Sequence, residues 1–241
     1  MRRCYNKHNI KSKAVKRCLL RTKKRKETTM STEFIVLSVI AALSAYLLGG
    51  INGAIILSRL VYHEDIRTKG SGNPGFTNFK RVHGFCPATF AAMAIDIFKT
   101  IIPVVTFMLL FGHFFQNAQF GAVFTLLFCM IGHCFPVWYR FKGGKAVLAY
   151  LSGIWFVDWR MGLICFGIFV VILLTVKYMS LASMTFAFTS PIVLFLLGCK
   201  DWLVLVTAAV LSILVIARHH QNIARLCKGT ESKFTLKSKK S

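Results

Sequence analysis

The sequence predicts an all-α polytopic membrane protein with about seven transmembrane helices. Of its 241 residues, 55% are hydrophobic, and the mean hydropathy is +0.59. Apolar runs of roughly 16–25 residues recur along the chain, and helices of that length can cross a hydrocarbon core of about 30 Å. The sequence lacks the alternation of apolar and polar residues that is typical of membrane β-barrels, so the spans are expected to be helical.

The seven expected spans are distributed along the whole chain after residue 33. They are predicted at residues 34–57, 87–110, 120–138, 146–157, 161–176, 183–198 and 202–217, and the first is interrupted by Gly49, Gly50 and Gly53. The fourth is only about a dozen residues long, which is too short to cross a bilayer without local thinning. A half-buried helix is the alternative for this segment, so the count of seven depends on it. The second carries Asp96 and Lys99 three residues apart, and hence on one helical face. A charge pair at membrane depth either marks function or braces the bundle, and the sequence leaves both interpretations open.

The N-terminal residues 1–29 form a basic extension without the apolar core of a signal peptide. The first 30 residues contain twelve Lys or Arg and one Glu. Three interpretations compete: an arm that binds anionic lipid, a nucleic-acid-binding tail, or upstream sequence translated from the wrong start. We favour the third, with Met30 as the natural start. The membrane domain is then expected at residues 30–231, followed by a basic tail at 232–241.

Basic loops predict the orientation in the membrane. With seven spans, most of the basic loop residues lie on one side, which the positive-inside rule assigns to the cytoplasm. The C-terminus is therefore expected in the cytoplasm and the N-terminus outside. A strongly basic N-terminal arm would lie on the wrong side, which favours the start at Met30. The residues that set this orientation are Arg67, Lys69, Lys80, Arg81, Arg140, Lys142, Lys145 and Lys177.

Common cofactor and nucleophile motifs are absent from the sequence. The eight cysteines form no CxxC pair and do not cluster with histidines, so neither a disulfide framework nor a metal site is expected. The run Gly143-Gly144-Lys145-Ala146 lacks the Ser or Thr of a Walker-type loop, and no GxSxG elbow occurs. We therefore expect no metal and no cofactor.

Four polar clusters are expected on the cytoplasmic side, at residues 70–81, 140–145, 180–183 and 219–225. The first, GSGNPGFTNFKR, combines glycines with Ser, Thr and Asn donors and two cations, which are the components of an anion-binding loop. A flexible polar connection between two helices is the alternative, because such residues are also common in turns. In the last cluster a histidine at the membrane boundary is more often structural than catalytic.

Three of these stretches carry a resemblance to a known family. Residues 70–81 resemble the GSGNxGxTNxxR motif of the bacterial acyl-phosphate:glycerol-3-phosphate acyltransferases, the PlsY family. Residues 132–145 resemble that family's GHxxPxxxxFxGGKG motif, and residues 219–231 resemble its third motif. Three ordered motifs between about residues 30 and 231 make the resemblance specific. It implies a seven-helix enzyme of the bacterial inner membrane whose active site faces the cytoplasm.

The resemblance implies transfer of a fatty acyl group from acyl-phosphate to the sn-1 hydroxyl of glycerol 3-phosphate. The products would be lysophosphatidic acid and phosphate, early in phospholipid synthesis. The implied partners are these two substrates and membrane lipid, with no nucleic acid; the oligomeric state is left open. The family lacks an obvious protein base, and substrate phosphate is thought to help take the hydroxyl proton.

The resemblance also assigns roles to particular residues. Glycerol 3-phosphate would be held by Ser71, Arg81, Lys145, His219 and Asn222. The first motif would surround the leaving phosphate of the donor, and Ser183, or Ser180 if the alignment shifts, would line the same pocket. The remaining expected substrate-binding residues are Gly72, Asn73, Gly75, Thr77, Asn78, Gly143, Gly144, Ser180, Ser183, Arg225 and Glu231.

The chain departs from the family motifs at Phe76, at Ala146 and at residues 148–150, where Leu-Ala-Tyr replaces the family's Ala-Thr. Ala146 stands where the family has Gly, and Phe76 stands where it has Ala. If the second loop needs glycine at 146, Lys145 is displaced and activity is reduced or altered. The charged and amide positions of the motifs are retained, so we expect a working enzyme. A transporter of an organophosphate or another anion is the alternative function, since it would use similar basic pockets. It is disfavoured because the two halves of the chain are not similar and the polar clusters lie at one face.

Overall fold

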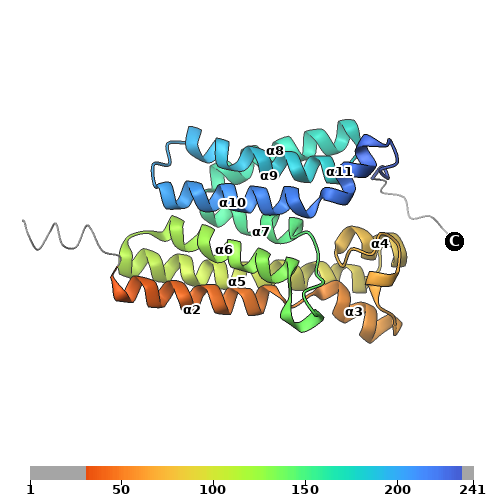
Figure 1. The fold of residues 1–241 in the computed structure, drawn as a ribbon, viewed down its shortest axis with the longest axis horizontal. Helices are drawn as coiled ribbons and strands as arrows, with labels where there is room; N and C mark the ends of the chain where they lie inside the picture. The colour runs from red at the N-terminus through yellow and green to blue at the C-terminus, as the bar shows by residue number, and fades with distance from the viewer. Residues whose placement is uncertain (1–30, 235–241) are drawn as a thin grey trace, which may run out of the picture. The chain divides into compact units, whose positions relative to one another are not determined.

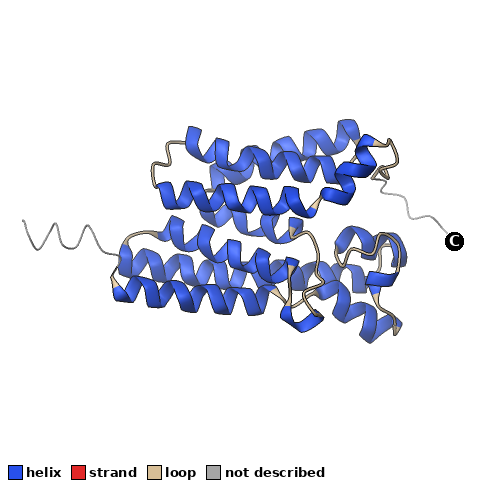
Figure 2. Ribbon diagram, viewed as in Figure 1, coloured by secondary structure: helices blue, strands red, loops and turns tan. Residues whose placement is uncertain are grey.

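The structure is a computed structural model that describes residues 31–234, and all regular secondary structure in this range is helical (Figure 2). The chain divides into two compact units, residues 1–40 and 41–241. Of the first unit, only Ser31 and the start of helix α2 lie among the described residues, and all other described residues belong to the second unit. The expectations for residues 1–29, for Met30 and for most of the C-terminal tail fall outside the described range.

The first expected span is divided into two helices. Helix α2 covers Thr32–Gly49 and helix α3 covers Gly53–Tyr62, so the break lies at the glycines that were expected to interrupt the span at 34–57. Asn52 begins α3, because its side-chain oxygen accepts a hydrogen bond from the Ile55 backbone N–H at 2.9 Å. Such an N-cap satisfies a backbone donor that has no partner within the helix. The break at residues 50–52 places backbone groups inside the bundle.

Two long helices follow, α5 (Pro87–Phe115) and α6 (Ala118–Cys134). Proline at the first position of α5 suits a helix start, where its missing N–H is not needed. The side chains of Asp96 and Lys99 on α5 are each 3% exposed and form an ion pair of 2.8 Å. The prediction that these two residues share a helical face is confirmed, and the pair lies inside the bundle.

The remaining apolar stretches form helices α7 (Val147–Val157), α8 (Trp159–Val176), α9 (Met179–Leu196) and α10 (Trp202–Arg218). Asp158 and Asp201 begin α8 and α10 by accepting hydrogen bonds from backbone N–H groups of the first turn. The short helix α7 contacts α5, α6 and α8, and α6 also contacts α10. In Figure 1, α8, α9 and α10 lie along one side of α7.

By length and composition, five helical segments of the described chain could cross a membrane. A sixth is formed if α10 and the short helix α11 (His220–Cys227), which meet at a bend of 56°, count as one span. Helix α7, the fourth expected span, has 11 residues and is shorter than these segments. The protein is thus an all-helical, multi-pass membrane protein.

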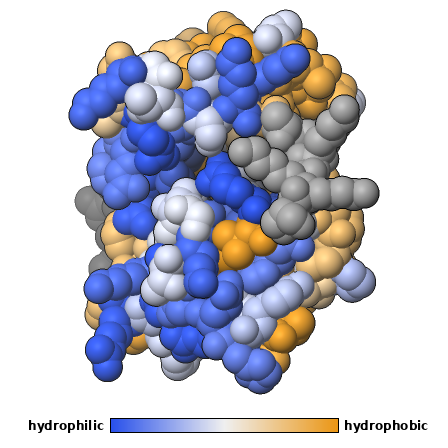
Figure 3. All heavy atoms as spheres, turned by 90° about the vertical axis from the view of Figure 1, so that its right-hand side faces the viewer, coloured by the Kyte–Doolittle hydropathy of each residue, from blue (hydrophilic) through white to orange (hydrophobic). Residues whose placement is uncertain are grey.

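The polar segments gather at one end of the bundle, on the right of Figure 1. Here lie α3, α4 (Phe76–His83), α11 and the short 3-10 helices η1 (Ile66–Thr68) and η2 (Val137–Tyr139). A buried cluster of Ala54, Ile55, Ile66 and Phe79 holds α3, η1 and α4 together. Hydrophilic side chains cover much of this end (Figure 3).

Candidate active site

The first loop, residues 69–75, connects η1 to α4 and is braced by the side chain of Asn78. Asn78 is 1% exposed. Its amide nitrogen donates to the carbonyls of Ile66 at 3.3 Å and Lys69 at 3.0 Å, and its oxygen accepts from the Ser71 N–H at 2.8 Å. Asn78 therefore shapes the loop from within, and its expected contribution to phosphate binding is indirect.

Glycines allow this loop to fold tightly over Asn78. Gly70 and Gly72 have φ values of +58° and +72°, in the left-handed region that glycine adopts most readily. A Cβ atom on Gly70 would also overlap with the Asn78 side-chain oxygen. The loop leads into the N-terminus of α4, where the first backbone N–H groups have no helical acceptor and favour an anion.

The last turn of α4 supplies two cations. The Arg81 Nη2 atom donates to the Ser232 hydroxyl at 3.1 Å, which brings the C-terminal segment against α4. The Lys80 ammonium lies 4.4 Å from the ring centres of both Phe85 and Phe234. Burial lowers the pKa of Lys80. Arg81 is exposed, so it can reach a ligand above the loop.

The second loop, residues 140–146, is held down by an arginine from α10. The Arg218 Nε and Nη2 atoms donate to the carbonyls of Gly144 and Gly143, each at 3.1 Å. The Gly144 N–H in turn donates to the carbonyl of His133 at 3.0 Å. A Cβ atom at either glycine would collide with backbone or ring atoms of His133, so the loop depends on both glycines.

The third motif begins where α10 bends into α11. His219 is 3% exposed, and its Nδ1 atom lies 2.7 Å from the carbonyl of Val215. Asn222, on the first turn of α11, accepts a hydrogen bond from the Lys145 ammonium of the second loop. Its amide nitrogen donates to Glu231 at 2.7 Å. The second and third motifs are thus joined through one asparagine.

Glu231 is the centre of this arrangement. Its Oε1 atom accepts from the Ser180 hydroxyl of α9 at 2.8 Å as well as from Asn222, and its Oε2 atom accepts from the Arg225 Nε atom at 2.7 Å. Burial by itself would raise the pKa of Glu231, but hydrogen bonds from Arg225, Asn222 and Ser180 outweigh it and lower the pKa. Glu231 is therefore a carboxylate at neutral pH.

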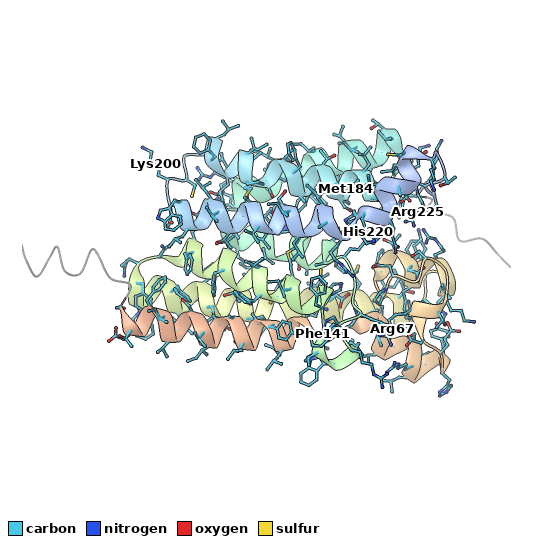
Figure 4. All side chains as sticks on the ribbon, in the orientation of Figure 1. Arg67, Phe141, Met184, Lys200, His220 and Arg225 are labelled. Carbon is cyan, nitrogen blue, oxygen red and sulfur yellow. The ribbon has the colours of Figure 1, made fainter. Side chains whose placement is uncertain are left out.

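Cations outnumber this carboxylate around the second loop. Burial and the nearby Arg225 cation lower the pKa of Lys145 to about 8, against the opposing effect of Glu231. Arg218 and Arg81 also act on Lys145 through their charges. Figure 4 shows Arg225 and Arg67 at this end of the bundle and Lys200 at the other. An excess of positive charge in a partly buried setting is suited to binding anions.

The structure connects many of the expected site residues, but not all by direct contact. Lys145, Asn222, Arg225, Glu231 and Ser180 form one continuous hydrogen-bonded group. Ser183 instead donates to the Met179 carbonyl at 2.7 Å, so Ser180 is the serine of α9 that contacts this group. The remaining first-motif residues lie on the first loop and the start of α4: Ser71, Gly72, Asn73, Gly75 and Thr77.

Sequence reasoning missed three residues that position this site. Arg218 holds the second loop, Ser232 contacts Arg81, and Asn52 donates to the Pro74 carbonyl of the first loop at 3.0 Å. Arg218 directly precedes His219, so its position next to the third motif could have indicated a role in the site. Neither Ser232 nor Asn52 stands out from other polar residues in the sequence. Between residues 31 and 234, no group of three His, Cys, Asp or Glu residues could hold a metal ion.

Comparisons with known proteins show which family the chain resembles over most of its length. The family model described as glycerol-3-phosphate acyltransferase matches residues 39–229. A glycerol-3-phosphate acyltransferase of Syntrophotalea carbinolica is 39% identical over 81% of this chain and 96% of its own length. One from Francisella tularensis subsp. mediasiatica is 35% identical over 81% of this chain and 92% of its own length.

Two crystal structures of PlsY (YgiH), an integral membrane glycerol 3-phosphate acyltransferase, have a similar fold. The glycerol 3-phosphate form has a TM-score of 0.73 and 33% identity, and covers 82% of this chain and 96% of the PlsY chain. The lysophosphatidic acid form has a TM-score of 0.71 and 32% identity, and covers 83% and 96%. With its three motifs and connected cation site, the chain belongs to the glycerol-3-phosphate acyltransferase family.

Proposed function

We propose that this protein transfers a fatty acyl group from acyl-phosphate to the sn-1 hydroxyl of glycerol 3-phosphate. The products are lysophosphatidic acid and inorganic phosphate. Forms of the related PlsY structures with glycerol 3-phosphate and with lysophosphatidic acid support the acceptor and the product. The acyl-phosphate donor rests on the resemblance of the three motifs and on a site with an excess of positive charge.

The observation that carries this proposal is the connection of the second and third motifs through Lys145, Asn222 and Glu231. Lys145 and Arg225 supply charge for a phosphate, and Arg81 supplies a guanidinium from α4 that can bind two phosphate oxygens. The first loop and the N-terminus of α4 offer backbone N–H groups for a second phosphate. Two anions held side by side are what the reaction requires.

His219 is suited to bind the acceptor hydroxyl. A carbonyl only accepts hydrogen bonds, so the contact with Val215 assigns the proton of a neutral His219 ring to Nδ1. The Nε2 atom is then an acceptor, which can orient the sn-1 hydroxyl through its proton. The sequence offered no carboxylate to orient this histidine, and the helix backbone serves that purpose instead.

In the proposed reaction the hydroxyl oxygen attacks the acyl carbonyl carbon of the donor. A new ester C–O bond forms, and the bond between the carbonyl carbon and the phosphate oxygen breaks. The hydroxyl proton passes to a phosphate oxygen, and the phosphate leaves. Acyl-phosphate is already activated, so the protein contributes mainly by positioning the two substrates and stabilising developing negative charge.

The proposal is tested by phosphate release from palmitoyl-phosphate by the purified full-length protein in detergent micelles. Release is expected only with glycerol 3-phosphate present, with lysophosphatidic acid formed in equal amount. Release without the acceptor would indicate hydrolysis. Product formation from palmitoyl-CoA but not from palmitoyl-phosphate would refute the proposed donor. Uptake of glycerol 3-phosphate into vesicles without product would favour the transporter.

We further propose that the protein lies in the bacterial inner membrane with its active site and C-terminus on the cytoplasmic side and its N-terminus outside. Seven spans would include α7 as a short fourth span and α10 as the last. Support comes from the basic residues of the active-site end, since the positive-inside rule assigns such loops to the cytoplasm.

A further inference from the structure

The ion pair inside the bundle is part of a larger polar group that the proposed reaction does not use. The Lys99 ammonium lies 2.8 Å from the Asp96 Oδ1 atom and 2.9 Å from the His133 Nδ1 atom, and it donates to the Ile51 carbonyl at 2.5 Å. An ammonium group has three N–H donors, and each has an acceptor here. Because Lys99 donates to Nδ1, the proton of the neutral His133 ring is on Nε2.

One end of this group fixes the break between α2 and α3. The Asp96 Oδ1 atom accepts from the Gly53 N–H at 3.3 Å, and Lys99 binds the carbonyl of Ile51. Asn52 lies between these two anchored residues and donates to the Pro74 carbonyl at 3.0 Å. The position of the first loop therefore depends on the ion pair through a single intervening residue.

The other end of the group supports the second loop. The His133 carbonyl accepts from the Gly144 N–H at 3.0 Å, and the His133 Nε2 atom would be the nearest neighbour of a Cβ atom on Gly144. The Pro74 carbonyl is 3.2 Å from the same Cβ position. Gly144 thus lies between the imidazole of His133 and the first loop, next to Lys145 in the sequence.

We propose that Asp96, Lys99 and His133 are positioning residues that set the distance between the first and second loops. The loops supply the residues proposed to hold the two anionic substrates, so the catalytic part of this inference rests on the proposed function. Reactions between bound groups are sensitive to misplacement of about 1 Å, which can cost about 100-fold in rate. Each loop keeps its own cations, so substrate affinity should change much less than turnover.

The test compares the full-length wild type with the double variant Asp96→Asn/Lys99→Met and with His133→Phe. The double variant removes both charges together and leaves no unpaired charge in the bundle, and His133→Phe retains a ring of similar size. We expect kcat with palmitoyl-phosphate to fall at least about ten-fold, while the KM for glycerol 3-phosphate changes by less than about three-fold. Each variant leaves a buried polar atom without its partner, so the melting temperature should fall by several degrees, and kcat is measured well below it.

A second measurement follows the loop distance without any reaction. Spin labels at Lys69→Cys and Lys142→Cys, with the other accessible cysteines replaced by serine, report the separation of the loops by double electron–electron resonance. We expect a narrow distance distribution in the wild-type background and a broader one with either variant. Thr125→Val is the matched control, because Thr125 is a buried residue of α6 whose hydroxyl, within residues 31–234, bonds only to the Gly121 carbonyl of its own helix.

Wild-type kcat and an unchanged distance distribution in both variants would overturn the inference and leave the ion pair as a brace of the bundle. Equal losses in the Thr125→Val control would also overturn it, since the effect would then be general. If the wild type itself makes no product from palmitoyl-phosphate, the proposed donor fails, and the distance distributions decide the inference alone.

Discussion

At the scale of single residues, Ala146 has a backbone conformation that its side chain disfavours. It begins α7 with φ of +57° in the left-handed region, where the family motif has glycine. That conformation costs a non-glycine residue about 1–2 kcal/mol. Alanine at this position is compatible with the contact between the Lys145 ammonium and the Asn222 side chain. The alanine is accommodated at a cost in stability.

We therefore predict that Ala146→Gly stabilises the protein. Relieving the backbone strain stabilises the folded state by more than the extra freedom of glycine stabilises the unfolded chain. The free energy of unfolding should therefore rise by roughly 0.5–1 kcal/mol. Thermal unfolding in detergent measures it, and kcat should not fall. Ala149→Gly, in the interior of the same helix, should destabilise the protein by about 1 kcal/mol or more. A lower melting temperature for Ala146→Gly than for the wild type would contradict the inference that the backbone at Ala146 is strained.

The lowered pKa of Lys145, about 8, predicts an alkaline loss of activity. Lys145 is protonated below this pH and loses its charge above it, so kcat/KM for glycerol 3-phosphate should fall as pH rises through about 8. Lys145→Arg should keep its activity over that range, because arginine stays protonated. Lys142→Arg, at an exposed position of the same loop, should leave the profile unchanged. An alkaline limb that persists in Lys145→Arg would exclude Lys145 as its cause.

The sequence predicted which residue types form the site better than it predicted how they are held. Lys145, Asn222 and Glu231 were recognised from their motifs, and they do contact one another. Arg218 and Asn52 were not, because their role is to bind backbone carbonyls of distant loops. Such contacts depend on the folded path of the main chain and leave no pattern in side-chain identity.

At the scale of elements, helix ends were harder to predict than helix existence. All seven apolar stretches are helical, but the first breaks at residues 50–52 and the last bends at His219. Gly49, Gly50 and Gly53 indicated the first interruption, whereas hydropathy carries no signal for the bend at His219, just beyond the last apolar stretch. The break before α3 depends on a cap at Asn52 and on its anchors from α5, which are tertiary contacts.

The second loop is an element whose shape depends on one bidentate arginine. Arg218→Lys should lower kcat/KM about ten-fold, because one ammonium cannot reproduce the planar pair of donors to Gly143 and Gly144. Steady-state kinetics with both substrates measure the loss. Arg160→Lys is the matched control, since Arg160 makes a similar two-point contact with Asp158 outside the site. Equal losses in the two variants would contradict a specific role of Arg218.

At the scale of the whole molecule, the proposed orientation predicts which end is accessible from outside the cell. A cysteine at Lys200, on the loop before α10, should react with a membrane-impermeant maleimide in intact spheroplasts. A cysteine at Lys142 should react only after the membrane is permeabilised. Both proteins are expressed in a background whose accessible native cysteines are serine. The reverse labelling pattern would place the active site on the outer face.

The carboxylate of Glu231 has a consequence for which solutes the site admits. This carboxylate belongs to the chain and already accepts hydrogen bonds from Arg225 and Asn222. Any incoming anion therefore competes with Glu231, whose effective concentration beside these donors is high. A singly charged solute such as chloride or acetate gains little from that exchange, whereas a phosphate dianion gains more from the same cations. In the proposed reaction the tethered carboxylate would therefore set a charge threshold for ligand binding, and it would compete with the phosphate product for the same cations.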